Sequence, residues 1–146
     1  MLHTFFIGEW TFKRKIFTGE NVQGTAKGTA IFEEGENPTT LIYSEKGELQ
    51  LTNNNNSFSF FRSFIYEFED DKLTLIYNDG ANIGQHYQTY QTEGERLVSL
   101  NPHICGADVY DGYFEKLSAN SYKQYVKVIG AKKDYEVETE YCKMAV

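Results

Sequence analysis

Arg14, Glu45 and Arg62 are the charged side chains best placed to do chemistry inside this protein. Each lies in a segment in which every second residue is mainly apolar, and each occupies one of those positions. Residues two apart on a strand point to the same side, so all three are expected to face inward. Buried charges are costly unless they are paired. The pattern predicts either an interior ion pair between Glu45 and Arg62 that fixes strand register, or a polar cavity wall whose guanidinium groups bind a carboxylate or phosphate.

A second group of reactive side chains comprises His103, Cys105, Asp108 and Tyr110, residue types that carry out proton transfer and nucleophilic attack. On one regular strand the first two would face one side and the last two the other. All four could then line one pocket only if a bulge intervened near Gly106. A structural role is the alternative, in which His103 caps a loop and Asp108 bonds backbone at a barrel rim.

Tyrosines add hydroxyl groups to the same inward face. The inward aromatic set is expected to be mostly core, with some members lining a pocket and supplying polar points on an apolar wall. The candidate ligand-binding residues are Arg14, Tyr43, Glu45, Arg62, Tyr66, His103, Asp108, Tyr110, Tyr135 and Tyr141.

The charge balance limits the partners. The 146 residues carry a formal charge of −7, and no basic run is longer than Lys132 and Lys133. Nucleic-acid binding needs a positive patch, and a membrane-spanning helix needs about 20 apolar residues. The first ten residues also lack the features of a signal peptide. We therefore expect a cytoplasmic protein that binds neither nucleic acid nor membrane; the sequence carries no signal of its oligomeric state.

The two cysteines, Cys105 and Cys142, have no metal-ligand spacing to each other or to the three histidines. Two isolated cysteines in a chain without a leader are typical of free thiols. We expect no metal site, no disulfide and no cofactor.

Short segments with period-two alternation fill the chain between turn-forming clusters. The expected strands are 9–17, 24–33, 40–51, 57–69, 72–77, 83–91, 95–101, 105–115, 122–130 and 133–142. Asp79 with Gly80 is the clearest hairpin signal. The small inward residues of 24–30 are expected to enlarge the interior. The sequence predicts a single all-β domain over 1–146, an antiparallel meander closed into a barrel of roughly eight to ten strands, with 2–7 as the one helical segment.

The opening Gly8-Glu9-Trp10 resembles the signature of the first strand of lipocalins and related calycins, where the tryptophan plugs one end of the barrel. The residues that follow are similar to a family of small lipocalin-like proteins, mostly bacterial and fungal, classified as a domain of unknown function. The similar positions include Arg14, Ile16, Gly28, Ala30, Phe32, Tyr43, Glu45, Gly47, Arg62, Tyr66, Asp79 and Gly80, and the most distinctive blocks are HICGADVY at 103–110 and GAKKDY at 130–135. This chain departs from the family pattern at Ala81, Ile83, Gly84 and Ala131. The resemblance implies a lipocalin-like barrel and no established activity.

Three functions fit these features. The favoured one is a binding module that encloses an aromatic or anionic organic ligand in a partly polar cavity. One alternative is a cofactor-independent acid/base enzyme of the cyclase, isomerase or decarboxylase type, and the other is a packed structural or interaction domain without a ligand. The commonest enzyme classes are disfavoured because the sequence has no phosphate loop and no hydrolase elbow.

Overall fold

The alternating pattern forms strands over most of residues 3–145, the part of the chain that the computed structural model describes. The elements are α1 (His3–Phe6), β1 (Gly8–Thr18), β2 (Asn21–Glu34), β3 (Thr40–Leu51), β4 (Ser57–Glu69), β5 (Lys72–Tyr77), β6 (His86–Glu93), β7 (Arg96–Ser99), β8 (His103–Cys105), β9 (Asp108–Ser118), β10 (Ser121–Ile129) and β11 (Asp134–Lys143). The strands β3, β4 and β5 have the predicted bounds. Aromatic and β-branched side chains at alternate positions fit a pleated, half-buried surface, which explains these strands.

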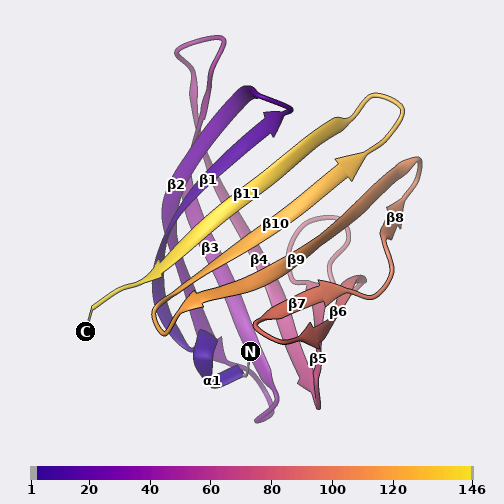
Figure 1. Cartoon of the computed structure of the whole chain (residues 1–146). Coiled ribbons are helices and arrows are strands. Elements are labelled where there is room, and N and C mark those ends of the chain that lie inside the picture. The colour runs from indigo at the N-terminus through magenta and orange to yellow at the C-terminus, as the bar shows by residue number, and fades with distance from the viewer. Residues whose placement is uncertain (1–2, 146) are drawn as a thin grey trace.

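The strands follow one another around a closed antiparallel barrel, with α1 at one end (Figure 1). The circle closes because β10 pairs with both β9 and β11, and β11 pairs with β1. Ten strands form the wall, since β8 pairs only with β9. The predicted all-β barrel with a short N-terminal helix is confirmed. Leu2, which begins the predicted helical segment, lies outside the described residues.

The end of the barrel beside α1 is filled by aromatic side chains. Phe6 and Trp10 are both fully buried, and the indole Nε1 of Trp10 donates a hydrogen bond of 2.9 Å to the carbonyl of Phe6. Their rings pack on Phe32, Phe114 and Tyr122, with centroid separations of 4.9–6.2 Å. Edge-to-face and tilted packing of this kind stabilises aromatic cores beyond the area buried. The predicted plug at one end of the barrel by Trp10 is confirmed.

The small inward residues of β2 have a different role from the predicted one. A Cβ atom on Gly28 would lie 2.1 Å from the carbonyl oxygen of Lys46, and one on Gly47 would lie 2.4 Å from that of Lys27. These glycines therefore let β2 and β3 approach closely, as glycine does at bends of barrels. No residue of β2 lines the interior cavity described below, so the prediction that they enlarge it is wrong.

The connection between β5 and β6 also differs from the prediction. Asp79 and Gly80 do form part of a turn, with Gly80 at a φ of 70°, but they lie in a longer loop over residues 78–85. The loop begins along the edge of β4 that pairs with β5, where the amide of Asn78 donates to the Ser63 carbonyl at 3.1 Å and Asp79 Oδ2 accepts from the Ser63 amide at 2.9 Å. Residues 83–85 therefore belong to this loop, and the strand predicted over 83–91 begins at His86.

Both cysteines are exposed free thiols, as the sequence predicts. Among residues 3–145, no helix has the length and apolar character needed to cross a bilayer. The same residues bring no three His, Cys, Asp or Glu side chains together as a metal site.

Candidate functional site

The barrel encloses a cavity of about 350 Å³ that is lined by side chains from eight of its strands. The wall consists of Arg14, Ile16, Tyr43, Glu45, Arg62, Phe64, Tyr66, Leu75, Tyr77, Tyr87, Tyr110, Gln124, Val126, Val128, Tyr135, Val137 and Thr139. Seven of the ten residues singled out in the sequence lie on it. The other three, His103, Asp108 and Tyr141, lie outside the wall.

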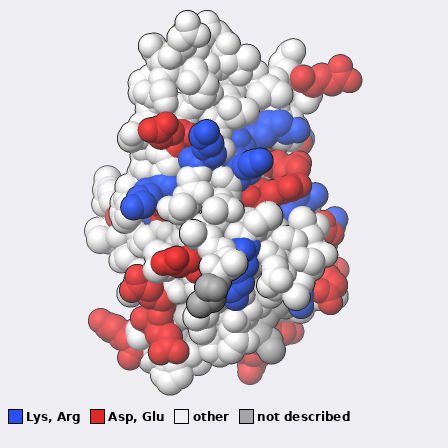
Figure 2. Space-filling model, turned by 90° about the vertical axis from the view of Figure 1, so that its left-hand side faces the viewer, with Lys and Arg blue, Asp and Glu red and all other residues white. Residues whose placement is uncertain are grey.

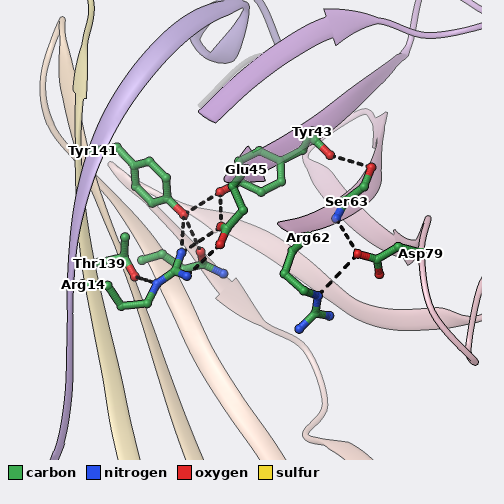
Figure 3. A network of polar contacts seen from close by, with 9 residues as sticks. Arg14, Tyr43, Glu45, Arg62, Ser63, Asp79, Thr139 and Tyr141 are labelled. Atoms are coloured by element: carbon green, nitrogen blue, oxygen red, sulfur yellow. Dashed lines mark hydrogen bonds and ion pairs between the residues drawn. The ribbon is translucent and has the colours of Figure 1, made fainter. Parts of the chain in front are cut away.

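At one side of the cavity, Arg14 of β1 and Glu45 of β3 form a bidentate ion pair (Figure 3). The Arg14 Nη1 and Nη2 atoms donate to the two carboxylate oxygens at 2.7 and 2.8 Å, and Arg14 Nε donates to Thr139 Oγ1 at 2.8 Å. Glu45 is 5% exposed and Arg14 17%. Bidentate hydrogen bonds between a guanidinium and a carboxylate are among the strongest polar interactions in proteins.

The predicted ion pair between Glu45 and Arg62 is wrong, although the two residues are opposite each other in the register of β3 and β4. Figure 3 shows the Arg62 guanidinium turned away from Glu45 toward Asp79. Its Nε lies 3.6 Å from Asp79 Oδ2, and the side chain is 48% exposed. Arg14 reaches Glu45 instead because β2, the strand between them, has the small Ala26, Gly28 and Ala30 on its inner face where the two side chains meet.

Tyr43 and Tyr141 complete this buried network. The Tyr43 hydroxyl donates to Glu45 Oε1 at 2.5 Å and lies 3.0 Å from the Tyr141 hydroxyl. Because Tyr43 has a single proton and gives it to the carboxylate, Tyr141 is the donor in the bond between the two tyrosines. Burial raises the pKa of Tyr43, and it raises the pKa of Tyr141 to about 12 despite the nearby Arg14.

The charges of the network are fixed at neutral pH. Burial alone would raise the pKa of Glu45, but the hydrogen bonds and charge of Arg14 outweigh burial and hold that pKa below its usual value. Desolvation would lower the pKa of Arg14, but the hydrogen bond to Glu45 and the electrostatic effects of Tyr141, Glu45 and Tyr43 together outweigh it and raise that pKa. Glu45 is thus a carboxylate that already accepts from Arg14 and Tyr43, an arrangement that suits a structural ion pair better than proton abstraction.

A different set of side chains surrounds Arg62 on the cavity wall. Its guanidinium carbon lies 5.2 Å from the centroid of the Phe64 ring. Phe64 packs on Tyr77 and Tyr87 at 5.4 and 5.5 Å, and Tyr87 packs on His103 at 5.1 Å. Within residues 3–145, the hydroxyls of the cavity tyrosines other than Tyr43 take part in no hydrogen bond. These are Tyr66, Tyr77, Tyr87, Tyr110 and Tyr135.

The hairpin of β8 and β9 corrects the predicted arrangement of the second reactive group. The chain reverses at Gly106, which has a φ of 63°, so residues 105–115 do not form one strand. Cross-strand partners share a face, and His103 is opposite Tyr110 while Cys105 is opposite Asp108. All four thus share one face, contrary to the prediction, but only Tyr110 lines the cavity.

At the rim, Asp108 forms an ion pair of 3.0 Å with Lys133. His103 is half-buried against the rings of Tyr87 and Tyr110. Burial and the nearby His86 lower the pKa of His103, which keeps its imidazole neutral at pH 7. These two residues therefore have structural contacts at the edge of the cavity.

Sequence reasoning missed Tyr77 and Tyr87 as wall residues. Tyr77 follows the inward Leu73 and Leu75 at two-residue spacing, so the period-two pattern contains the signal for it. Tyr87 carries no such signal, because the register of β5 and β6 shifts there. Such bulges re-aim a side chain without changing the composition of the strand.

Three solved structures with a similar fold cover nearly all of this chain. The S-type phycobiliprotein lyase from Guillardia theta has a TM-score of 0.69 at 7% identity, over 98% of this chain and 90% of that one. A de novo designed fluorescence-activating β-barrel has a TM-score of 0.52 at 13% identity, over 97% and 95%. A redesigned β-barrel bound to DFHBI has a TM-score of 0.50 at 12% identity, over 96% of each chain. At these identities the likeness concerns the fold alone.

No curated protein sequence matches this chain significantly. A family model described as "Family of unknown function (DUF6314)" matches residues 6–143. The match includes all ten strands of the barrel wall and both residues of the buried ion pair, so this chain belongs to the DUF6314 family.

Proposed function

We propose that this protein binds a small, largely aromatic organic molecule in the cavity of its barrel. The observation that carries the proposal is the set of five tyrosine hydroxyls on the cavity wall that have no partner among the described residues. Polar groups inside proteins are normally hydrogen-bonded, so a wall with five free hydroxyls suits a guest that bonds to them. The volume of about 350 Å³ lies in the range of small-molecule sites.

Two further observations support binding over the alternatives. A packed structural domain would have filled this space, since protein interiors are close-packed. An acid/base enzyme would need a free base at the cavity, whereas Glu45 is held by Arg14 and Tyr43. The similar redesigned barrel is bound to DFHBI, which adds that a barrel of this fold can hold a small chromophore.

A thermal-shift screen of aromatic acids, their amides and fatty acids tests the proposal, because a ligand that binds only the folded protein raises its melting temperature. The matched variants are Val126→Phe, which adds a ring inside the cavity, and Val22→Phe, which adds the same ring at an exposed position. We expect aromatic hits to shift the wild type and Val22→Phe but not Val126→Phe. Equal shifts in all three proteins would place binding elsewhere and contradict the proposal.

A further inference from the structure

Two cations and one carboxylate lie on the cavity wall among the described residues, which gives the wall a net charge of +1. The protein as a whole carries −7, and the face drawn in Figure 2 has acidic side chains beside basic ones. Arg14 and Glu45 neutralise each other, so the unbalanced charge belongs to Arg62. A wall of opposite sign to its protein indicates an anionic guest, because a partly desolvated cation whose one ion pair is long still attracts a further counter-charge.

The donors of the two arginines differ in their availability. Each of the three nitrogens of Arg14 donates to Glu45 or Thr139 at 2.7 or 2.8 Å. Among residues 3–145, Arg62 forms an ion pair with Asp79 alone, whose Oδ2 lies 3.6 Å from its Nε. A carboxylate would therefore find the Nη1 and Nη2 atoms of Arg62 free for fork-shaped binding, which is the geometry that guanidinium offers best.

The side chains around Arg62 indicate the apolar part of the ligand. The guanidinium stacks on Phe64, and Tyr77 and Tyr87 continue this aromatic surface. Rings of this kind favour offset or edge-on contact with another ring. An acid whose carboxylate is attached directly to a flat ring would place the ring on this surface and its charge at Arg62.

We propose that the guest is a planar aromatic carboxylate whose oxygens bind the Nη atoms of Arg62, while its ring system lies against Phe64, Tyr77 and Tyr87. This inference rests on the proposed function, since it names the class of molecule that the same cavity binds. In this proposal Arg62 binds the carboxylate of the ligand, and Arg14 has the structural role of pairing with Glu45.

Calorimetric titration with 2-naphthoate and its neutral analogue 2-naphthamide tests the assignment. The proteins are the wild type, Arg62→Gln, Arg62→Lys and Arg96→Gln, a control that removes an arginine of similar exposure from the outer face. We expect the wild type to bind naphthoate more tightly than naphthamide. Arg62→Gln should lower the affinity for naphthoate by about tenfold or more, as expected for a lost charge-assisted bond, and leave the affinity for naphthamide unchanged. Arg62→Lys should give an intermediate affinity, and Arg96→Gln the wild-type one.

An Asp79→Asn variant should act in the opposite direction. The amide keeps an oxygen that can accept from the Ser63 amide but removes the charge that competes for Arg62, so naphthoate should bind a few-fold more tightly. Equal affinities of the wild type and Arg62→Gln for naphthoate would overturn the role of Arg62 while the proposed function stands. If neither naphthalene compound binds the wild type, the inference fails. The proposed function fails with it only if the whole thermal-shift screen is also negative.

Discussion

The two ends of this barrel, one beside α1 and one around Arg62, both contain inward-facing aromatic side chains. They differ in whether these side chains fill the interior. Beside α1, the rings of Phe6 and Trp10 pack on Tyr122 at 5.2 and 4.9 Å, and none of the three residues has measurable exposure. Around Arg62, Phe64 and Tyr87 pack at a similar distance of 5.5 Å, yet they border a cavity of about 350 Å³.

The difference shows that an inward-facing aromatic row does not determine whether a barrel is filled or hollow. At the closed end, a four-residue helix brings Phe6 into the barrel and offers its carbonyl to Trp10. At the open end, the hydroxyls of Tyr77, Tyr87 and Tyr110 border the cavity without a partner among the described residues, whereas the Tyr122 hydroxyl at the end beside α1 is buried without such a partner. Unpartnered hydroxyls thus occur at both ends, and the aromatic plug beside α1 is the local feature that distinguishes the filled end.

The largest contrast between the two ends should appear on removing one phenyl ring from each. We expect Phe6→Ala to lower the free energy of unfolding by about 3–5 kcal/mol, since it leaves a void in a closed core. Phe64→Ala should cost less than about half as much, because its ring already borders open space. Urea unfolding measures both, and equal costs would contradict the division into a filled and a hollow end.

The buried ion pair between the two ends gives the next prediction. Glu45→Ala leaves Arg14 without its counter-charge and should destabilise the protein by about 3–5 kcal/mol. The double change Arg14→Met with Glu45→Leu removes both charges and should be nearly neutral or stabilising. A double variant as unstable as Glu45→Ala would show that the interaction between Arg14 and Glu45 stabilises the barrel in itself. It would contradict the view that the cost of Glu45→Ala comes from one uncompensated buried charge.

A pair of hydroxyl deletions sharpens the comparison further. Tyr43→Phe removes a bond to a carboxylate, which is worth about 1.5–3 kcal/mol, whereas Tyr66→Phe removes a hydroxyl without a partner among the described residues. We expect the first variant to lose stability by that amount and the second to change it by less than about 0.5 kcal/mol. Both rings stay in place, so thermal unfolding of the two proteins isolates the hydroxyls.

The smallest effect concerns His103 at the open end. Because its pKa in the folded protein is lowered below the usual value of about 6.5, the unfolded chain binds this proton more readily. The corresponding stability is present above pH 6.5 and is lost as the pH falls through the lowered pKa. We expect His103→Gln to lose less stability than the wild type between pH 7 and pH 5. A His103→Gln variant with the same pH dependence as the wild type would contradict this prediction.

The sequence predicts the direction of most inner side chains, because period two is a property of each strand by itself. Val137, Thr139 and Tyr141 on β11 all face inward as predicted. The partner of Glu45 could not be predicted in this way, because it depends on which side chains can reach across a neighbouring strand. Arg14 passes over the small residues of β2, and this path exists only in the closed barrel.

Local chain reversals explain the other errors. One residue of shift changes the face of every later position, as happens in the register of β5 and β6 beside Tyr87. The turn at Gly106 does the same for the residues on either side of it. The faces of the strands can thus be predicted from the sequence. The turns and bulges that also determine the candidate site cannot be predicted in this way.

The pairing of β1 with β11 also has a consequence for how the chain folds. Phe12 is the partner of Tyr141 in this pairing, so the first strand finds its second neighbour near the far end of the chain. Contacts between residues so distant in sequence form slowly, because closing a long loop costs entropy before the contact repays it. Until β11 arrives, the edge of β1 that later pairs with it has exposed amide and carbonyl groups. This edge is where a half-folded chain would pair with the wrong strand or with another molecule.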